Sequence, residues 1–271
     1  MTEALQQVRR FRGVGQIFVF NWHFYAVTFV VDCAAMFLTR SPMQSGLRFA
    51  LCLIAVAATF WALASLLVSH YIYDRSPLYK WDWLAAVLKK APENWVNIHA
   101  GLDETSASLI RLFPNARRRI LDIFLASEMS EPSIERARRL AHNPIAPERA
   151  SPFDLPLEDD ESDAFFLILA AHELRDHASR VRLFGEIRRA LRQGGCIVLV
   201  EHLRDWRNFL AFGPGFLHFF SRREWLSVAE QAGLRITTES NVTPFIGCFV
   251  FKKLAPAGQH NGFERKALHD S

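Results

Sequence analysis

The sequence contains few cysteines, and none are spaced as metal ligands usually are. Cys33, Cys52, Cys196 and Cys248 include no C-x-x-C pair, and the first two lie in strongly apolar stretches. This pattern indicates neither a disulfide framework nor a zinc site. The histidines are scattered as well, so no metal is expected.

Long runs of one charge are also missing. The chain has 32 Lys and Arg against 28 Asp and Glu, a net charge of +4. No basic run with interleaved aromatic residues indicates nucleic-acid binding. The modest positive excess is most simply explained by basic flanks beside anionic lipid headgroups. We therefore expect membrane lipid as a partner, and no nucleic acid.

Charge is nearly absent from two stretches near the N-terminus, residues 15–38 and 46–68. After Arg48 the second stretch has about 20 uncharged residues, the length a helix needs to cross a ~30 Å hydrocarbon core. The first is long enough but contains His23 and Asp32, and a charge near the middle of a spanning helix is costly. It therefore either spans as a pair with the second stretch or lies partly in the interface.

The two stretches predict a helical hairpin in the inner (cytoplasmic) membrane. Only the short segment 39–45 connects them, and basic residues are concentrated outside that connection: Arg9, Arg10, Arg12, Arg75, Lys80, Lys89 and Lys90. The positive-inside rule then places both ends, and the globular part, in the cytoplasm. A cleaved signal peptide is not expected, because the first apolar stretch is too long and no small-residue cleavage site follows. The predicted units are a hairpin at 1–80, a globular domain at 81–255 and a loose tail at 256–271.

From Trp95 onward, short apolar runs alternate with amphipathic stretches, which is typical of an α/β doubly wound sheet. Ser130 is the expected cap of one helix, and Gly194 with Gly195 the expected end of another. We predict strands at 95–100, 117–124, 164–174 and 196–203, a short one at 149–153, and helices at 103–113, 130–141, 177–193 and 221–234. Segments 235–241 and 246–254 are predicted to close the sheet as an antiparallel hairpin.

Three sequence blocks occur in order: "FPNARRRILD", "PFDLPLEDDESDAFFLILAAHEL" and "EIRRALRQGGCIVLVEH". Together they resemble class I S-adenosylmethionine-dependent methyltransferases of the small-molecule, type 11-like kind, over about residues 95–253. The resemblance implies a Rossmann-like sheet, mostly parallel with a reversed last strand, and S-adenosylmethionine as cofactor. It places Asp122 at the ribose hydroxyls and Asp154 near the adenine.

The first loop, "NIHAGLDE", departs from the family pattern because Gly101 is its only glycine and His99 stands near the usual acidic position. Glycine permits a positive φ and a close ligand approach, and one at the tightest point can suffice. Asp103 or Glu104 could meet the ammonium group of the cofactor. The cofactor-binding residues implied by the resemblance are His99, Gly101, Asp103, Asp122 and Asp154.

Titratable residues lie at the ends of two strands that this fold places beside the acceptor. His172 and Glu173 end the fourth predicted strand, and Glu201 and His202 lie at the end of the fifth. His172, Glu173 and His202 are the predicted catalytic residues, either as a base for a hydroxyl or thiol or as a donor that orients a carboxylate. In the alternative, His172 only packs under the next helix and Glu173 pairs with Arg175.

The segment "NFLAFGPGFLHFF" supplies the predicted lid over a hydrophobic acceptor: Phe209, Phe212, Phe216, Phe219 and Phe220. A plain membrane-contact surface is the alternative. In outline the chain is similar to bacterial quorum-signal methyltransferases that make methyl esters of 3-hydroxy fatty acids, which implies a fatty acid carboxyl group as acceptor. Phospholipid, quinone and thiol acceptors stay open, as does a non-catalytic membrane interaction protein that reuses the fold.

Overall fold

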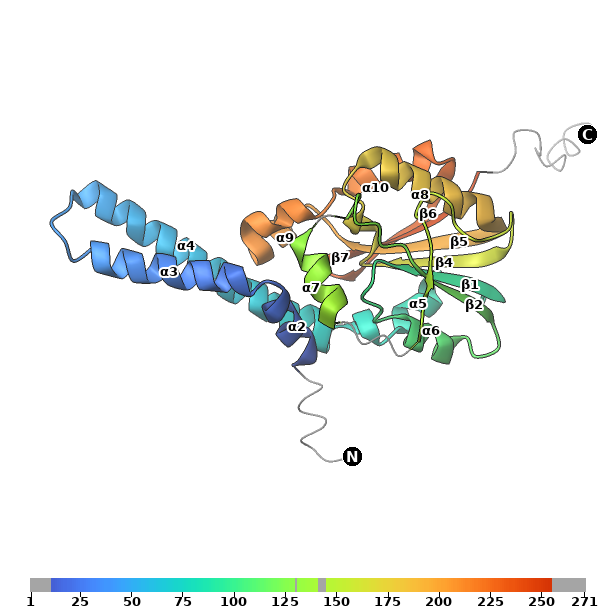
Figure 1. Cartoon of the computed structure of the whole chain (residues 1–271), viewed down its shortest axis with the longest axis horizontal. Coiled ribbons are helices and arrows are strands. Elements are labelled where there is room, and N and C mark those ends of the chain that lie inside the picture. The colour runs from blue at the N-terminus through green and yellow to red at the C-terminus, as the bar shows by residue number, and fades with distance from the viewer. Residues whose placement is uncertain (1–10, 130, 141–144, 255–271) are drawn as a thin grey trace, which may run out of the picture.

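A seven-stranded sheet with the order β3-β2-β1-β4-β5-β7-β6 forms the centre of the globular domain (Figure 1). The computed structural model describes residues 11–129, 131–140 and 145–254. Strands β1 to β5 pair in parallel, whereas β7 is antiparallel to both of its neighbours. The predicted α/β sheet with a reversed last strand is confirmed. The strands are β1 (Asn94–His99), β2 (Arg117–Asp122), β3 (Glu148–Arg149), β4 (Ser162–Ile168), β5 (Leu191–His202), β6 (Leu234–Thr243) and β7 (Ile246–Lys253).

Helices cover both faces of the sheet, because its central strands are apolar on both sides. In β4, Phe165 and Leu167 belong to one core cluster, and Phe166 and Ile168 to the other. This alternation is the period-two geometry of a strand. The first face is covered by α8 (His177–Ala190) and α10 (Arg222–Gln231), and the second by α5 (Asp82–Val87) and α6 (Ser106–Leu112).

The N-terminal helices form a hairpin that projects from one end of the domain (Figure 1). Asp32 accepts a 2.8 Å hydrogen bond from the Thr59 hydroxyl across the hairpin, and the Tyr25 and Ser65 hydroxyls lie 3.3 Å apart. The polar residues of the first apolar stretch therefore help to join the two long helices. The helices are α2 (Arg12–Phe20), α3 (Trp22–Leu38) and α4 (Ser45–His70).

One helical stretch among the described residues, Ser45–Tyr79, is long and apolar enough to cross a membrane. A second passes the same test if Gly13–Phe20 and Trp22–Leu38, bent by 69°, are one broken span. Phe29, Phe37 and Phe49 are 68%, 75% and 71% exposed. The hairpin therefore carries its large apolar side chains on its outside. The predicted basic residues Arg9 and Arg10 lie outside the described residues.

The chain after the hairpin packs under the sheet. It passes through η1 (Tyr71–Arg75) and η2 (Pro77–Tyr79), where Ile72 and Leu78 are fully buried. Asp74 accepts hydrogen bonds from the Gly13 and Val14 amides, at 2.8 and 3.0 Å. An acidic group at a helix N-terminus is favourable, so the base of the hairpin is held to the domain.

Several predicted boundaries differ from the observed ones. Helix α8 ends at Ala190, and Gly194 and Gly195 lie inside β5, so their predicted helix-ending role is wrong. A Cβ at Gly195 would lie 2.7 Å from the Asp163 carbonyl oxygen of β4, so the glycine permits a close approach of two strands. Strand β3 also lies slightly earlier than predicted, while Ser130 and the tail at 256–271 are outside the described residues.

Candidate active site

The carboxyl ends of β1, β2, β4 and β5 bring together most of the predicted site residues. His99 ends β1 and pairs in register with Asp122, which ends β2. Strand β4 leads into a short 3-10 turn, η3 (Ala171–Glu173), and β5 ends at His202. In parallel α/β sheets, ligands bind outside these carboxyl ends.

The loop after β1 is built on Gly101, which has a φ of +119°. Its amide donates a 3.0 Å hydrogen bond to Nδ1 of His99. The His99 proton must then lie on Nε2, and burial lowers the pKa of this histidine, which keeps it neutral. Nε2 is buried without a hydrogen-bond partner. His99 therefore offers a donor at the position where the family resemblance implies an acidic acceptor, which suits a carboxylate better than an ammonium group.

The two acidic residues beyond this loop serve the neighbouring structure. Asp103 Oδ1 accepts from the Thr105 and Ser106 amides, at 3.1 and 2.9 Å, just before and at the start of α6. Glu104 accepts a 2.7 Å hydrogen bond from the Tyr79 hydroxyl. Sequence reasoning identified these carboxylates but could not foresee these bonds.

Asp122 lies at the edge of a pocket of about 330 Å³. Its side chain is nearly buried and accepts a 3.1 Å hydrogen bond from the Phe124 amide. The pocket is lined by Asp122, Phe124, Leu125, Arg138, Arg149, Ala150 and Ser151. A carboxylate for paired hydroxyls, beside apolar and aromatic walls for a planar base, fits the adenosine part of S-adenosylmethionine. Asp154 is exposed and does not line this pocket, which argues against its predicted adenine contact.

A second cluster lies at the ends of β4 and β5 and contains His172, Glu173 and Glu201. His172 Nδ1 is 2.7 Å from Glu201 Oε2. The other Glu201 oxygen accepts from the Ala171 and His172 amides, at 2.9 and 3.2 Å. Glu201 is fully buried, and it fixes both the turn and the imidazole ring. Sequence analysis pointed to Glu201 together with His202 at this strand end, and of the two it is Glu201 that contacts the His172 ring.

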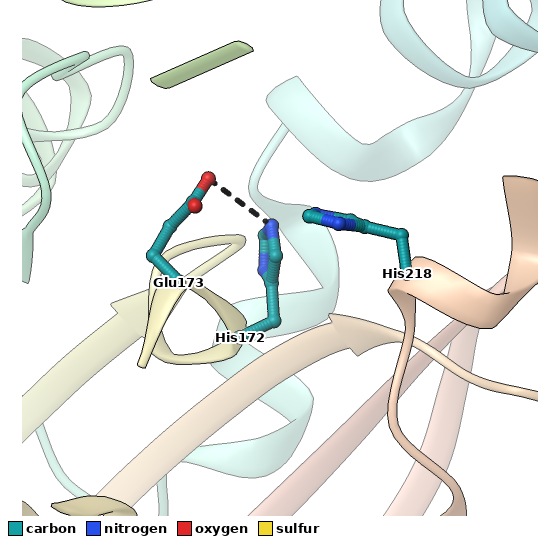
Figure 2. Close-up of side chains that lie close together, drawn as sticks. All are labelled: His172, Glu173 and His218. Atoms are coloured by element: carbon teal, nitrogen blue, oxygen red, sulfur yellow. Dashed lines mark ion pairs between the residues drawn. The ribbon is translucent and has the colours of Figure 1, made fainter. Parts of the chain in front are cut away.

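Opposing effects set the charge of this cluster. Burial alone would lower the pKa of His172, but the carboxylates of Glu201 and Glu173 outweigh burial and raise it to about 10. Glu173 Oε1 lies 3.5 Å from His172 Nε2 (Figure 2), and Glu173 Oε2 is buried without a partner. Burial raises the pKa of Glu173, yet His172 outweighs it and the pKa is lowered. At neutral pH the cluster holds an imidazolium between two carboxylates.

His218, which the sequence analysis did not single out, faces His172 from another segment (Figure 2). The two rings lie 5.2 Å apart at 80°. Burial and the charge of His172 lower the pKa of His218 to about 3, so it is neutral. His172, Glu173 and His218 offer ligand atoms within 4.8 Å of one another, the spacing of a cation site. His172 is protonated at neutral pH and both of its ring nitrogens face carboxylates, so the ring has no free lone pair for a metal, and we assign the cluster to proton and hydrogen-bond chemistry.

His202 has a different environment from the one predicted for a catalytic residue. Its Nε2 is 3.1 Å from the Tyr73 hydroxyl and its Nδ1 is 3.1 Å from the Phe245 carbonyl oxygen. Burial lowers its pKa to about 4. Both nitrogens are therefore engaged in a neutral ring that stacks on Phe219, 4.6 Å away. The geometry supports packing rather than proton transfer.

The phenylalanine-rich segment forms α9 (Trp206–Phe212) and η4 (Gly213–His218). Phe209 packs edge-on against Trp61 of the hairpin, with ring centres 5.4 Å apart, and Phe216 packs on Phe209 at 5.2 Å. Phe212 lies beside His202. Phe220 instead lies 3.7 Å under the Arg180 guanidinium and packs against the domain core, so its predicted lid role is wrong.

Comparison with known proteins identifies the domain. Residues 110–199 match a family model described as a methyltransferase domain. The chain carries a methyltransferase domain of the S-adenosylmethionine-dependent class. No protein among the curated ones matches the sequence.

Several solved structures are similar to parts of this chain. An S-adenosylmethionine-dependent methyltransferase from Aquifex aeolicus is 16% identical with a TM-score of 0.50, over 66% of this chain and 90% of that one. The [4+2]-cyclase SpnF is 15% identical with a TM-score of 0.49, over 67% and 82%. Human N-acetylserotonin methyltransferase, solved with S-adenosylmethionine, is 14% identical with a TM-score of 0.48, over 83% and 66%. At these identities the likeness concerns the fold alone.

We expect Asp122→Asn to weaken S-adenosylmethionine binding by about 10- to 100-fold, because a hydrogen bond to a charged group is worth ~1.5–3 kcal/mol. Titration calorimetry on the detergent-solubilised protein measures the dissociation constant. Asp154→Asn is the matched control and should bind as the wild type does. Equal affinities for Asp122→Asn and the wild type would remove Asp122 from the cofactor site.

Proposed function

We propose that this protein is a membrane-anchored methyltransferase that methylates an oxygen of a hydrophobic acceptor, preferably the carboxyl group of a fatty acid such as a 3-hydroxy fatty acid. The proposal rests on His172, which is held between two carboxylates beside an aromatic segment that contacts the hairpin. The hairpin would lie in the inner membrane, with the methyltransferase domain in the cytoplasm.

A carboxylate acceptor needs orientation more than activation. When bound, S-adenosylmethionine supplies an electrophilic methyl group on its sulfonium sulfur. A carboxylate is already a nucleophile, so the His172 imidazolium has only to donate its Nε2 proton in a hydrogen bond and hold the acceptor in line. The unpartnered Oε2 of Glu173 is placed to accept a hydrogen bond from a hydroxyl on the same acceptor.

The segment formed by α9 and η4 offers a route from the lipid phase. Besides the Phe209–Trp61 contact, it exposes Trp206, Leu210 and Leu217 at 68%, 49% and 55%. Exposed apolar side chains next to an apolar hairpin suit a greasy acceptor that enters from the membrane surface. The same segment would exclude water from the His172 cluster.

A hydroxyl acceptor such as a quinol is the second candidate. It would need a base. Glu201 binds Nδ1 of His172, which is the way a carboxylate usually orients a catalytic histidine so that Nε2 can take a proton. The 3.5 Å separation between Nε2 and Glu173 Oε1 is longer than an ordinary hydrogen bond, so a bound acceptor would replace Glu173 as the partner of Nε2. The two candidates predict opposite pH responses: activity on a carboxylate falls as His172 loses its proton near pH 10, whereas activity on a hydroxyl rises.

The acceptor can be identified by mass spectrometry of lipid extracts from cells with and without the protein. We expect a species heavier by one methylene group, and methyl label from S-adenosylmethionine should enter it with purified protein. Label in a base-labile ester supports the carboxylate, and label in a base-stable ether supports the hydroxyl. Saturable cofactor binding without label in any extract would contradict the proposed transfer and favour a non-catalytic interaction protein.

We expect the full-length protein to stay in the membrane fraction after alkaline carbonate washing. Val56→Arg, on an exposed position of α4, should lower membrane retention, because an arginine at the centre of a spanning helix costs ~2.5–3.5 kcal/mol. Gln44→Arg, in the connection between α3 and α4, is the matched control and should be retained. Wild-type protein released into the wash would contradict the anchor.

A further inference from the structure

Helix α7 (Pro132–Leu140) lies at the carboxyl ends of the strands instead of along a face of the sheet. Figure 1 shows it beside α2, near the base of the hairpin. Its sequence "PSIERARRL" is mostly polar, and Ile134 is the described α7 side chain that joins the core. The position of α7 therefore depends largely on its charged side chains.

Arg138 of α7 binds the Asp122 carboxylate, which the cofactor would use. Its Nη1 lies 2.9 and 3.0 Å from the two Asp122 carboxylate oxygens, and it donates to the Ala100 carbonyl oxygen at 3.1 Å. The guanidinium also lies 4.1 Å over the Phe124 ring. The carboxylate and the aromatic wall of the pocket are both covered.

The same arginine fills the space beside the single glycine of the first loop. A Cβ at Gly101 would lie 2.2 Å from Arg138 Nη1 and 2.5 Å from its Cγ. The space that the missing side chain of Gly101 leaves beside the backbone is thus filled by the Arg138 side chain. Because cofactor hydroxyls need the Asp122 oxygens, Arg138 and S-adenosylmethionine compete for one place.

A second arginine ties α7 to the hairpin. Arg136 Nε donates a 2.9 Å hydrogen bond to the Phe20 carbonyl oxygen, at the end of α2. Phe20 stands at the 69° break between α2 and α3. Arg136 and Arg138, on one turn of α7, therefore connect the bend between α2 and α3 to Asp122, the carboxylate predicted to bind the ribose.

We propose that α7 is a gate on the cofactor site, in which Arg138 is the latch and Arg136 links the gate to the hairpin. S-adenosylmethionine binds once Arg138 has left Asp122, and the conformation of the α2–α3 bend biases that step. The proposal rests on the cofactor of the methyltransferase domain, and it adds a closed state with an intramolecular competitor.

The proposal predicts that removal of the Arg138 side chain strengthens the binding of S-adenosylmethionine. If the open state is populated at about 10%, the wild-type dissociation constant is about tenfold higher than that of the open state. We expect Arg138→Ala and Arg138→Gln to lower the dissociation constant for S-adenosylmethionine about 3- to 10-fold, and Arg136→Ala to lower it by a smaller factor. Arg139→Ala is the matched control, because Arg139 is on the same helix but is exposed and pairs only with Glu135 among the described residues.

Titration calorimetry on full-length protein in nanodiscs, with melting curves to verify folding, gives the answer without an activity assay. Weaker binding by both Arg138 variants would make Arg138 a cofactor ligand and overturn the gate. Unchanged binding would also overturn it, while leaving the methyltransferase assignment intact. Absence of binding in the wild type and in every folded variant would instead count against the cofactor itself.

Discussion

His172→Asn is expected to lower kcat/KM for methyl transfer about 100-fold or more and to leave the dissociation constant for S-adenosylmethionine within about twofold. The asparagine amide can still reach Glu201 from the position of Nδ1, but the group at Nε2 is lost. Loss of a positioned donor or base typically costs ~10²–10⁴ in rate. Initial rates with labelled S-adenosylmethionine and the identified acceptor measure the effect.

Two further variants make this test specific to the His172 cluster. Glu201→Gln should also reduce kcat, because a neutral amide no longer raises the pKa of His172. His202→Gln should retain more activity than His172→Asn, since His202 packs among aromatic rings. Near-wild-type activity of His172→Asn, in protein with a normal melting curve, would contradict the assigned role of His172.

Thermal stability is expected to fall as the pH rises from about 6.5 to about 10. The pKa of His172 is raised from 6.5 to about 10, so its ionic contribution is complete below pH 6.5 and is lost through pH 10. One pKa unit corresponds to ~1.4 kcal/mol, and a contribution of about 2–4 kcal/mol should shift the melting temperature by about 5–15 °C. Glu201, Glu173 and His218 face the ring.

Below pH 6.5, thermal stability is expected to fall as the pH is lowered. The pKa values of His202 and His218 are lowered to about 4 and about 3 by burial, so these rings stabilise the fold above pH 6.5 and lose that contribution below it. Melting curves recorded between pH 4 and pH 10 test both the acid and the alkaline limb of the plot of melting temperature against pH. His172→Gln should flatten the loss of stability above pH 6.5. It should also reduce the loss at acid pH, because the charge of His172 helps to lower the pKa values of His202 and His218. An alkaline limb that is unchanged in His172→Gln would show that its cause lies elsewhere.

Local patterns predicted the sheet well because they directly reflect burial and backbone geometry. The apolar run at β4 indicated a strand buried on both faces. The antiparallel close of β6 and β7 was predicted from the order of the last segments and from the reversed last strand that the family resemblance implies. Predicted ends were less accurate. The apolar letters continue past Ile168, but the chain leaves the sheet there, and Glu201 binds the amides of the η3 turn. That contact joins residues 30 positions apart, and no local pattern records it.

In the candidate site, too, some residues could be predicted from local sequence patterns, whereas others depend on contacts between distant segments. His99, Gly101, Asp122, His172 and Glu173 could be proposed from sequence, because strand ends in this fold converge on one crevice. Asp154 and Phe220 were assigned to the site by position in the chain, yet Asp154 is exposed and Phe220 packs against the domain core under Arg180. The importance of Glu201 and His218 depends on which side chains point at His172, which spacing does not reveal.

The sequence by itself determined the alternation of strands and helices, the apolar hairpin and the resemblance to methyltransferases, because these depend on residue type and short-range periodicity. Only the tertiary structure decided which charges meet. His172 lies between Glu201 and Glu173, and Arg138 lies on Asp122 beside Gly101. The physical reason is that ionic contacts, burial and pKa shifts depend on distances of a few ångströms between segments far apart in the chain. For the same reason the single glycine of the first loop, which looked like a weakened motif, is the place where a distant arginine competes with the cofactor.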